Sequence, residues 1–376
     1  MKEKALDYGR CIFIIALMLE TLFVLLDKSN YIIQHETWLF RFTFLLFGVK
    51  ILLTPYSKKE WIAITAMGVL GIISWLATDR EEIIRIVVLM ISCKEIDMKK
   101  AMKIVLYETI LGSAIIVLLA ITGIYGNVTV SGYFRGGGIE ETRYCLGMGH
   151  PNALHCMFLV TMTLMLALYE DRFNWLGYLA SFLLNYIMYL LTDSRTSFLI
   201  GAITVMFAVF MHYAIHLRNK KLLYYSAIAF IIGCTILSII IAIVGVDISL
   251  LRQIDIRING RFQWAHTDGG IQYWSLFSCK DNQNYFDMGY VRLFYWYGIV
   301  PAVIYITALC ATVYKCWVKK AYDAFLVIVV FAAYSLIEAH AISVYIGRNY
   351  VLFYMGALLF TDKIQTKNSK KDKERN

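Results

Sequence analysis

Long apolar blocks run through most of the chain, and they limit its possible folds more than any other feature. Each block approaches the roughly 20 residues that a helix needs to cross the hydrocarbon core of a bilayer. Of the 376 residues, 59% are hydrophobic, 17% are charged and only 3 are prolines. Soluble domains carry roughly 25% charged residues. We therefore predict an all-α polytopic membrane protein that forms a single integral membrane domain over residues 1–376.

The apolar blocks predict twelve transmembrane helices, so that both chain ends lie on one side of the membrane. The fourth block is the shortest, and Arg85 interrupts it. The predicted ranges are 11–26, 37–54, 61–77, 81–93, 101–124, 151–169, 173–192, 197–215, 222–244, 293–313, 323–338 and 342–360.

The distribution of basic residues orients these helices, because excess Lys and Arg belongs in cytoplasmic loops. With twelve spans and an inside N-terminus, the cytoplasmic segments hold 21 basic residues and the external segments hold 10. Without the fourth span, the basic tail at 361–376 would lie outside. We therefore predict cytoplasmic termini and a large external loop at 245–292, between helices nine and ten. The net charge of +9 does not indicate nucleic-acid binding, because the lysines sit mostly in short loops and the tail.

Arginine dominates the predicted external side, where it supplies 8 of the 10 basic residues. Its rigid donor fork matches phosphate bidentately. Arg41, Arg85 and Arg348 also fall in the outer parts of their helices, and an arginine at that depth usually faces a cavity or a partner. The set predicts an outward-facing cavity for an anionic ligand. The alternative is that these arginines snorkel toward the membrane surface or pair with Asp79, Glu81, Glu82 and Glu338.

The loop at 245–292 combines arginines, carboxylates and aromatic side chains, which are the groups that sugar rings and pyrophosphates need. Its aromatic residues could instead form an interfacial belt. Leu250, Leu251, Ile254 and Ile258 fit one helical face near its start, which predicts an amphipathic helix in the interface. The sequence has no D-x-D motif and no clustered His and Glu residues, so we predict no catalytic metal.

The third external loop, 125–150, ends in ETRYCLGMGH, and Pro151 and Asn152 open the sixth helix. Pro151 suits the first turn of the sixth helix, where its missing donor does no harm. Arg143, His150 and Asn152 would then lie at the outer mouth of that helix. The alternative is a simple helix start, with His150 on the surface and Asn152 as a local cap.

The eighth helix begins within TDSRTSF, where Asp193, Ser194 and Thr196 can cap it. Arg195 stands at the positive end of this helix, where a cation is disfavoured. An anionic ligand would explain that position, and pairing with Asp193 is the alternative.

Four short motifs follow one another along the chain. They are Arg143…Gly149-His150-Pro151-Asn152, Ser194-Arg195-Thr196, Asn259-Gly260-Arg261, and Asp287-Met288-Gly289-Tyr290 with Gly298 eight residues after the tyrosine. They resemble the R…G-x-P-N, S-R-T, (S/N)-G-R and D-x-x-Y…G motifs of the O-antigen polymerase (Wzy-type) family, within the O-antigen ligase-like superfamily. Glu338 and Asn349 match an E…N pair in its last spans. The resemblance covers about half of the chain.

The resemblance implies an enzyme that joins lipid-linked oligosaccharide repeat units into a capsule, exopolysaccharide or O-antigen at the outer face of the bacterial cytoplasmic membrane. It implies undecaprenyl pyrophosphate as leaving group, no cofactor, and contacts with membrane lipid, a flippase and a chain-length regulator. A loop carboxylate or a histidine would act as general base. We predict catalytic roles for Arg143, Arg195, Arg261, Asp287 and His150, and substrate binding by Asn152, Trp264, Asp281, Tyr290, Arg348, Glu338 and Asn349.

Three other functions compete with this one. Ligases of the superfamily usually carry a histidine near the end of the large loop, where this chain has Asp281 and Asp287, so the sequence favours a polymerase. A flippase or transporter would be expected to show inverted repeats, and no internal repeat is evident. A different integral-membrane glycosyltransferase would use acidic residues of the first external loop. Asp27 and Glu36 lie there without the usual paired context.

Overall fold

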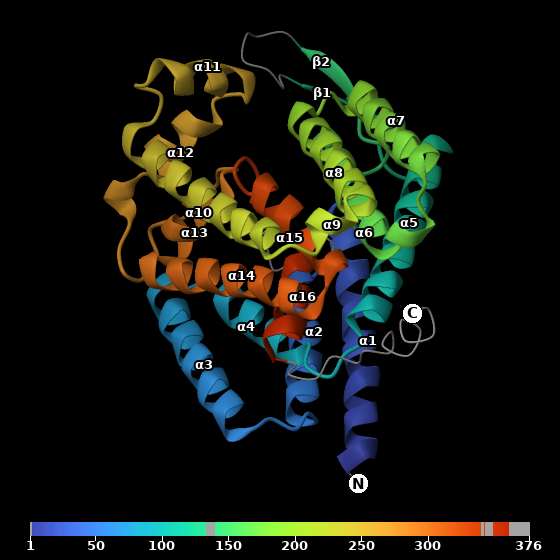
Figure 1. The fold of residues 1–376 in the computed structure, drawn as a ribbon. Coiled ribbons are helices and arrows are strands. Elements are labelled where there is room, and N and C mark those ends of the chain that lie inside the picture. The colour runs from blue at the N-terminus through green and yellow to red at the C-terminus, as the bar shows by residue number, and fades with distance from the viewer. Residues whose placement is uncertain (1, 133–139, 340–341, 343–348, 361–376) are drawn as a thin grey trace.

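The computed structural model describes residues 2–132, 140–339, 342 and 349–360, and helices make up most of it (Figure 1). Within these ranges eight helices are long and apolar enough to cross a membrane, which confirms a helical polytopic membrane protein. They are α1 (Lys2–Asp27), α3 (Lys58–Thr78), α5 (Met98–Ile121), α6 (Pro151–Leu168), α7 (Trp175–Thr192), α8 (Arg195–Tyr213), α10 (Lys221–Val244) and α14 (Ile299–Lys319).

Four shorter helices fall on the other predicted spans: α2 (Glu36–Leu52), α4 (Glu82–Ser92), α15 (Tyr322–Tyr334) and α16 (Tyr350–Phe360). Helices α4 and α16 have 11 residues each. At 1.5 Å per residue each is roughly 16 Å long, about half the thickness of the hydrocarbon core. Helix length alone therefore supports eight crossings rather than twelve.

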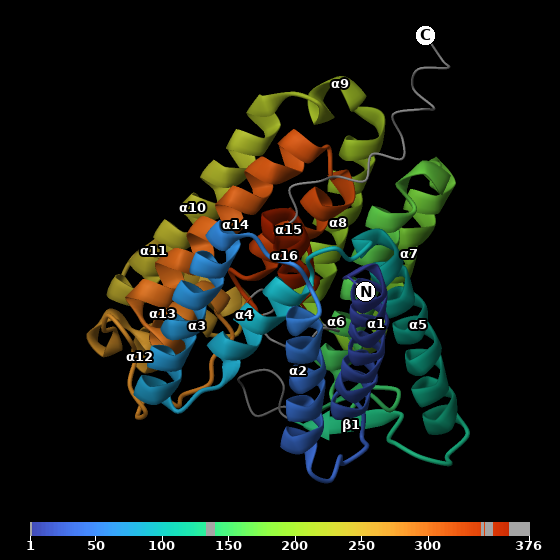
Figure 2. The ribbon, with the colours of Figure 1, turned by 90° about the horizontal axis from the view of Figure 1, so that it is seen from below.

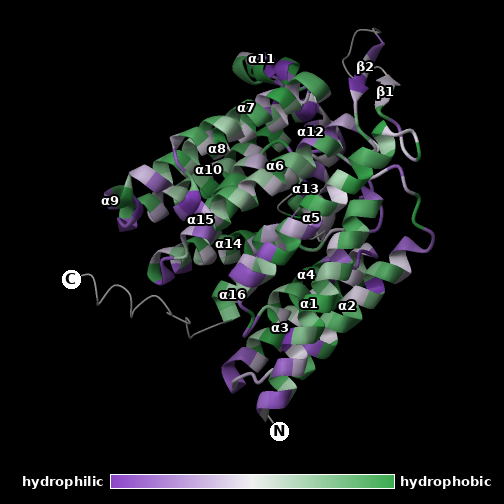
Figure 3. Cartoon of the chain, turned by 90° about the vertical axis from the view of Figure 1, so that its right-hand side faces the viewer, coloured by the Kyte–Doolittle hydropathy of each residue, from purple (hydrophilic) through white to green (hydrophobic). Residues whose placement is uncertain are grey.

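The strands of the described chain, β1 (Thr129–Gly132) and β2 (Glu141–Tyr144), form an antiparallel hairpin that the all-α prediction did not include. Figures 1 and 3 show it at the same end of the molecule as α11 (Ser249–Arg257), far from the first turn of α1. Figure 3 also shows hydrophobic colour along most of the helices, with hydrophilic residues gathered at helix ends and turns.

Helix starts follow local capping chemistry. The Ser57 side chain accepts from the backbone N–H of Glu60, and the Glu60 side chain accepts from Ser57 in return, which starts α3. The Asp97 side chain accepts from Lys100 N at 3.2 Å and starts α5. The predicted range 101–124 therefore lies three residues too late, because the apolar block starts after the cap.

The tenth predicted helix, 293–313, is wrong in its bounds, because Gly298 divides this region into α13 (Gly289–Tyr297) and α14. Gly298 has φ +93°, and a Cβ there would lie 2.7 Å from the carbonyl oxygen of Leu276. The N–H of Ile299 donates instead to Ser275 O at 2.9 Å. The backbone of the large loop at residues 275–276 thus packs directly against the start of α14.

The eleventh predicted helix is also shorter than its apolar block, and part of the twelfth, 343–348, lies outside the described residues. Helix α15 ends at Tyr334 rather than at residue 338, so Glu338 lies in a non-helical segment, 335–339. Gly289 N donates to Ser335 O at 2.9 Å, and a Cβ on Gly289 would lie 2.8 Å from Glu338 O. This close approach fixes the segment against the start of α13.

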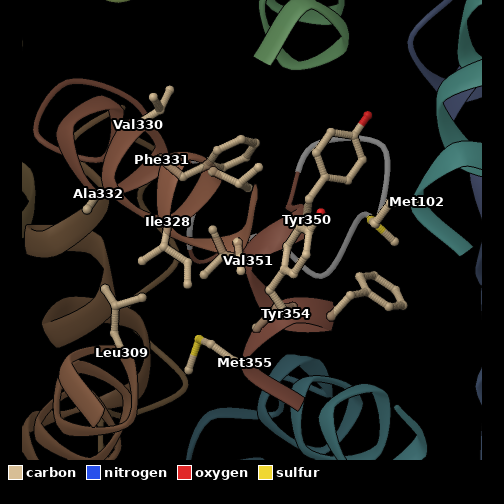
Figure 4. Close-up of a cluster of buried hydrophobic side chains, with 14 of the residues drawn as sticks. Met102, Leu309, Ile328, Val330, Phe331, Ala332, Tyr350, Val351, Tyr354 and Met355 are labelled. Atoms are coloured by element: carbon tan, nitrogen blue, oxygen red, sulfur yellow. The ribbon is translucent and has the colours of Figure 1, made fainter. Parts of the chain in front are cut away.

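The core lies around α6, α15 and α16. In the most apolar 18-residue stretch of α6, 72% of the residues are buried, against 17% in the corresponding stretch of α3. Helix α6 is therefore central and α3 peripheral. Figure 4 shows Phe331 of α15 and Val351 of α16 within one cluster that also holds Leu309 of α14 and Met102 of α5. In Figure 2, α4 lies between α2 and α3.

The large loop contains the helices α11 and α12 (Arg261–Gly269), a 3-10 turn at Ile271–Tyr273 and the start of α13. Outside the loop, a second 3-10 turn lies at Glu170–Arg172 and a short helix, α9, at Ile215–Arg218. The predicted amphipathic helix is present as α11. Leu251, Ile254 and Ile258 pack in a second apolar cluster beneath the loop. Leu250 is 62% exposed and lies off that face, which corrects the predicted set.

Candidate functional site

One polar cavity of about 300 Å³ gathers residues from all four motifs. It lies where the starts of α6, α8 and α12 meet the end of α11. Its lining consists of Arg143, His150, Asn152, Asp193, Ser194, Arg195, Thr196, Arg257, Ile258, Asn259, Arg261, Trp264 and Asp287. Segments more than 140 residues apart in the sequence thus form one site.

Arg143, on β2, is held by two carboxylates. Its Nη2 lies 2.5 Å from Glu141 Oε2 and 3.0 Å from Asp193 Oδ2. The residue is only 8% exposed. Asp193 therefore pairs with Arg143 rather than with Arg195, which removes the alternative explanation for Arg195. Ser194 occupies the N-cap of α8 without a side-chain cap bond.

Arg261 begins α12 and joins three parts of the chain. Its Nη2 lies 3.2 Å from Asp287 Oδ2 and 2.8 Å from Glu338 Oε1. Its Nη1 donates to Ile337 O at 3.1 Å. Burial opposes the charged form, but Glu338 and Asp287 outweigh it and leave the pKa of Arg261 raised. This arginine fastens the large loop to the segment after α15.

Arg195 and Arg257 differ from the first two arginines. Both are exposed and line the cavity, and neither has an ion pair or hydrogen bond within the described part of the chain. Arg257 was not among the predicted site residues. Its position two residues before Asn259-Gly260-Arg261, at the end of the amphipathic segment, is the signal that could have identified it.

Three helices begin at the cavity: α6, α8 and α12. Helix N-termini carry a partial positive charge and unpaired N–H groups, which attract anions. Asp255 already accepts from Phe262 N of α12 at 2.7 Å. The N-terminal ends of α6 and α8 therefore make the electrostatic potential in the cavity more positive, in addition to the charges of Arg195 and Arg257.

His150 caps α6, since its Nδ1 accepts from Asn152 N at 3.1 Å. A nitrogen that accepts carries no proton, so the neutral ring bears its proton on Nε2, where it is able to donate. Burial, and then the charge of Arg143, lowers the pKa of His150 below 6.5, against an opposing effect of Asp287. His150 is thus a neutral donor at neutral pH.

The remaining predicted residues divide by location. Asn152, Trp264 and Asp287 line the cavity, and Glu338 reaches it through Arg261. Arg348 lies outside the described residues, as does the predicted tail at 361–376.

Three predicted substrate contacts lie away from the cavity lining. Asp281 is exposed on a turn elsewhere in the loop. Tyr290 is 4% exposed, and its hydroxyl donates to Ala332 O at 3.1 Å, so its position corrects the predicted role. Asn349 is fully buried and hydrogen-bonds Tyr305 within the helical core.

A second, mainly apolar cavity of about 480 Å³ lies between α2, α3 and the start of α4. Arg41 lines it and pairs with Glu81, with Nε to Oε2 at 3.3 Å. Arg85 also lines it and lies 3.4 Å from Glu20 Oε1. Acidic partners therefore account for both arginines; Glu81 is among the partners that the alternative named, whereas Glu20 is not.

Among the described residues, no three His, Cys, Asp or Glu side chains are grouped as a metal site would require. No model of a known protein family, no curated protein and no solved structure matches the chain. The site itself and the motif resemblance are therefore the basis for assigning a function.

Proposed function

We propose that the protein is a polymerase that joins pyrophosphate-linked oligosaccharide repeat units at the outer face of a bacterial cytoplasmic membrane. One observation carries the proposal: all four motifs of the resemblance meet in a single arginine-rich cavity. The cavity combines charged donors with an aromatic side chain, Trp264, which suits a ligand made of sugar and phosphate.

The proposed reaction forms one glycosidic bond for each repeat unit added. The acceptor hydroxyl oxygen attacks the anomeric carbon of the donor unit, and the bond from that carbon to the lipid pyrophosphate breaks. The pyrophosphate leaves with the electron pair, and arginine donors stabilise its growing charge. The hydroxyl proton passes to a carboxylate. Asp287 lines the cavity and is our candidate base, because the Nδ1 of His150 already accepts a hydrogen bond.

In this proposal twelve segments cross the membrane, and both termini are cytoplasmic. The 21-to-10 distribution of basic residues supports it. Helix α15 would cross together with the non-helical segment 335–339 that follows it, and α16 would form part of the last span. Non-helical backbone is tolerated at membrane depth where protein or a polar cavity surrounds it.

An external cysteine should report this orientation. In a background with the exposed Cys11 and Cys279 replaced by serine, we expect Ser249→Cys on α11 to react with an impermeant thiol reagent in intact cells. Lys58→Cys, at the start of α3, is the matched control and should react only after permeabilisation. The opposite pattern for the two positions would overturn the topology.

Acidification should slow the reaction through His150. Because its pKa is lowered, the ring stays neutral down to a pH below 6.5, and the rate should fall only once Nδ1 is protonated and the cap is lost. We expect His150→Asn, which retains an acceptor and a donor, to move this acid limb to lower pH. His150→Ala should lose roughly 2- to 12-fold in rate, the value of one neutral hydrogen bond. Identical pH profiles for wild type and His150→Asn would contradict this role.

A cell-free assay tests the function directly. Purified protein would receive only lipid-linked repeat units, and products would be resolved by chain length. Chain growth supports a polymerase, and it should persist in EDTA. Transfer of preformed chains to a second lipid acceptor without growth would indicate a ligase, and no covalent change would favour a flippase.

A further inference from the structure

We propose that Arg257 binds the ligand together with Arg195, so that the cavity takes two linked phosphate groups. This inference rests on the proposed function and extends it to a residue that no motif contains. The structure divides the four cavity arginines into two that are neutralised by carboxylates and two that are not.

The carboxylates around the cavity are engaged by Arg143 and Arg261. Arg143 holds Glu141 and Asp193, and Arg261 holds Asp287 and Glu338. Four arginines and four carboxylates give formal neutrality, so net charge alone does not select an anion. The donors are what select it, because the guanidinium groups of Arg195 and Arg257 have no acceptor in the described part of the chain.

Helix α11 holds Arg257 at the cavity. Leu251 and Ile254 anchor the helix in the apolar cluster beneath the loop. The turn that follows is fixed by two bonds from α12 and its cap, Phe262 N to Asp255 Oδ1 at 2.7 Å and Gly260 N to Asp255 O at 3.0 Å. An exposed arginine on a helix fixed at both its face and its end is positioned for a ligand.

Two unpaired forks from separate elements, α8 and α11, suit a ligand with two anionic groups better than a ligand with one. A guanidinium fork binds one phosphate bidentately. The N-terminus of α8 adds further N–H donors, whereas at the start of α6 Pro151 has none and the N–H of Asn152 is donated to His150. The chemical class that this arrangement fits is a diphosphate ester, with inorganic pyrophosphate as its simplest probe.

Arg252 provides a matched control on the same helix. It is also exposed, but its Nε donates to Val246 O at 3.2 Å and it does not line the cavity. The replacements Arg257→Gln and Arg252→Gln remove the same charge from the same element. Any general effect of net charge or of α11 stability should therefore appear in both variants.

The test is isothermal titration of the purified full-length protein with inorganic pyrophosphate and, separately, with orthophosphate. We expect pyrophosphate to bind more tightly, and Arg257→Gln and Arg195→Gln each to weaken it by roughly 10- to 150-fold, with Arg252→Gln unchanged. Equal affinity for the two anions would overturn the two-phosphate ligand. Equal behaviour of Arg257→Gln and Arg252→Gln would overturn the role of Arg257.

This binding experiment is independent of polymer synthesis. Pyrophosphate binding that depends on Arg257, without chain growth in the cell-free assay, would refute the polymerase and leave the anion site standing. Chain growth that Arg257→Gln does not alter, with unchanged pyrophosphate affinity, would refute the inference and leave the polymerase standing.

Discussion

Replacing Arg261 with alanine is expected to abolish polymer and to lower the melting temperature of the solubilised protein. The side chain is 11% exposed and is the ion-pair partner of both Asp287 and Glu338. Removing one partner of a buried ion pair costs about 3–5 kcal/mol, because the other charge loses its compensation. Two carboxylates would face each other in the cavity, and α12 would lose its tie to the segment after α15.

Arg261→Lys retains the charge but not the fork. Each lost charge-assisted bond costs about 1.5–3 kcal/mol, so we expect roughly a 10- to 150-fold loss of rate. Polymer yield in cells and melting temperature after purification are the measurements, and Arg252→Lys is the control that should remain mild. Wild-type yield and stability in Arg261→Lys would show that this arginine is neither a substrate contact nor a tie.

Replacing Arg195 should reduce activity about as much as Arg261→Lys does. Unlike the replacement of Arg261, it should not lower the melting temperature. Arg195→Lys is expected to lose roughly 10- to 150-fold in rate if its fork holds the leaving group. Arg195→Gln should leave the melting temperature unchanged or slightly raised. It removes a cation from the positive end of α8, which relieves about 0.3–1 kcal/mol, and it deprives no carboxylate of the described chain of its ion-pair partner.

This contrast separates ligand binding from structure. A residue that only supports the fold would lose activity and stability together, as Arg261→Ala should. Arg195→Gln with a lowered melting temperature, or with normal polymer length and yield, would return Arg195 to a structural role. Both variants need a check that they reach the membrane in normal amounts, by immunoblot of the membrane fraction.

The parts of the fold that could be predicted are those governed by local chemistry. Apolar blocks place the long helices, and residues such as Asp97 at the start of α5 mark where they begin. The break at Gly298 could not be predicted, because it depends on contact with the backbone of Leu276, more than 20 residues earlier. The end of α15 at Tyr334 likewise depends on the approach of Gly289.

In the site, too, some features could be predicted from the sequence and others could not. Motif positions identified Arg143, Arg195 and Arg261, which do line one cavity. Their partners were beyond sequence reasoning: Asp193 is adjacent to Ser194-Arg195-Thr196 in the chain yet pairs with Arg143 across the fold. Tyr290 stands within a motif, but its hydroxyl bonds a carbonyl on α15. Residue type and spacing indicate which groups can do chemistry, whereas packing decides which of them stay available.

The bridge from Arg261 to Glu338 also sets an order on biosynthesis. The large loop is translated well before the segment that follows α15, so α12 is first made without one of its two carboxylate partners. The cavity closes only when that later segment has been made and has packed against Gly289. A nascent chain paused before residue 338 would therefore hold Arg261 through Asp287 alone, and the proposed site would be complete only once the last helices had joined the bundle.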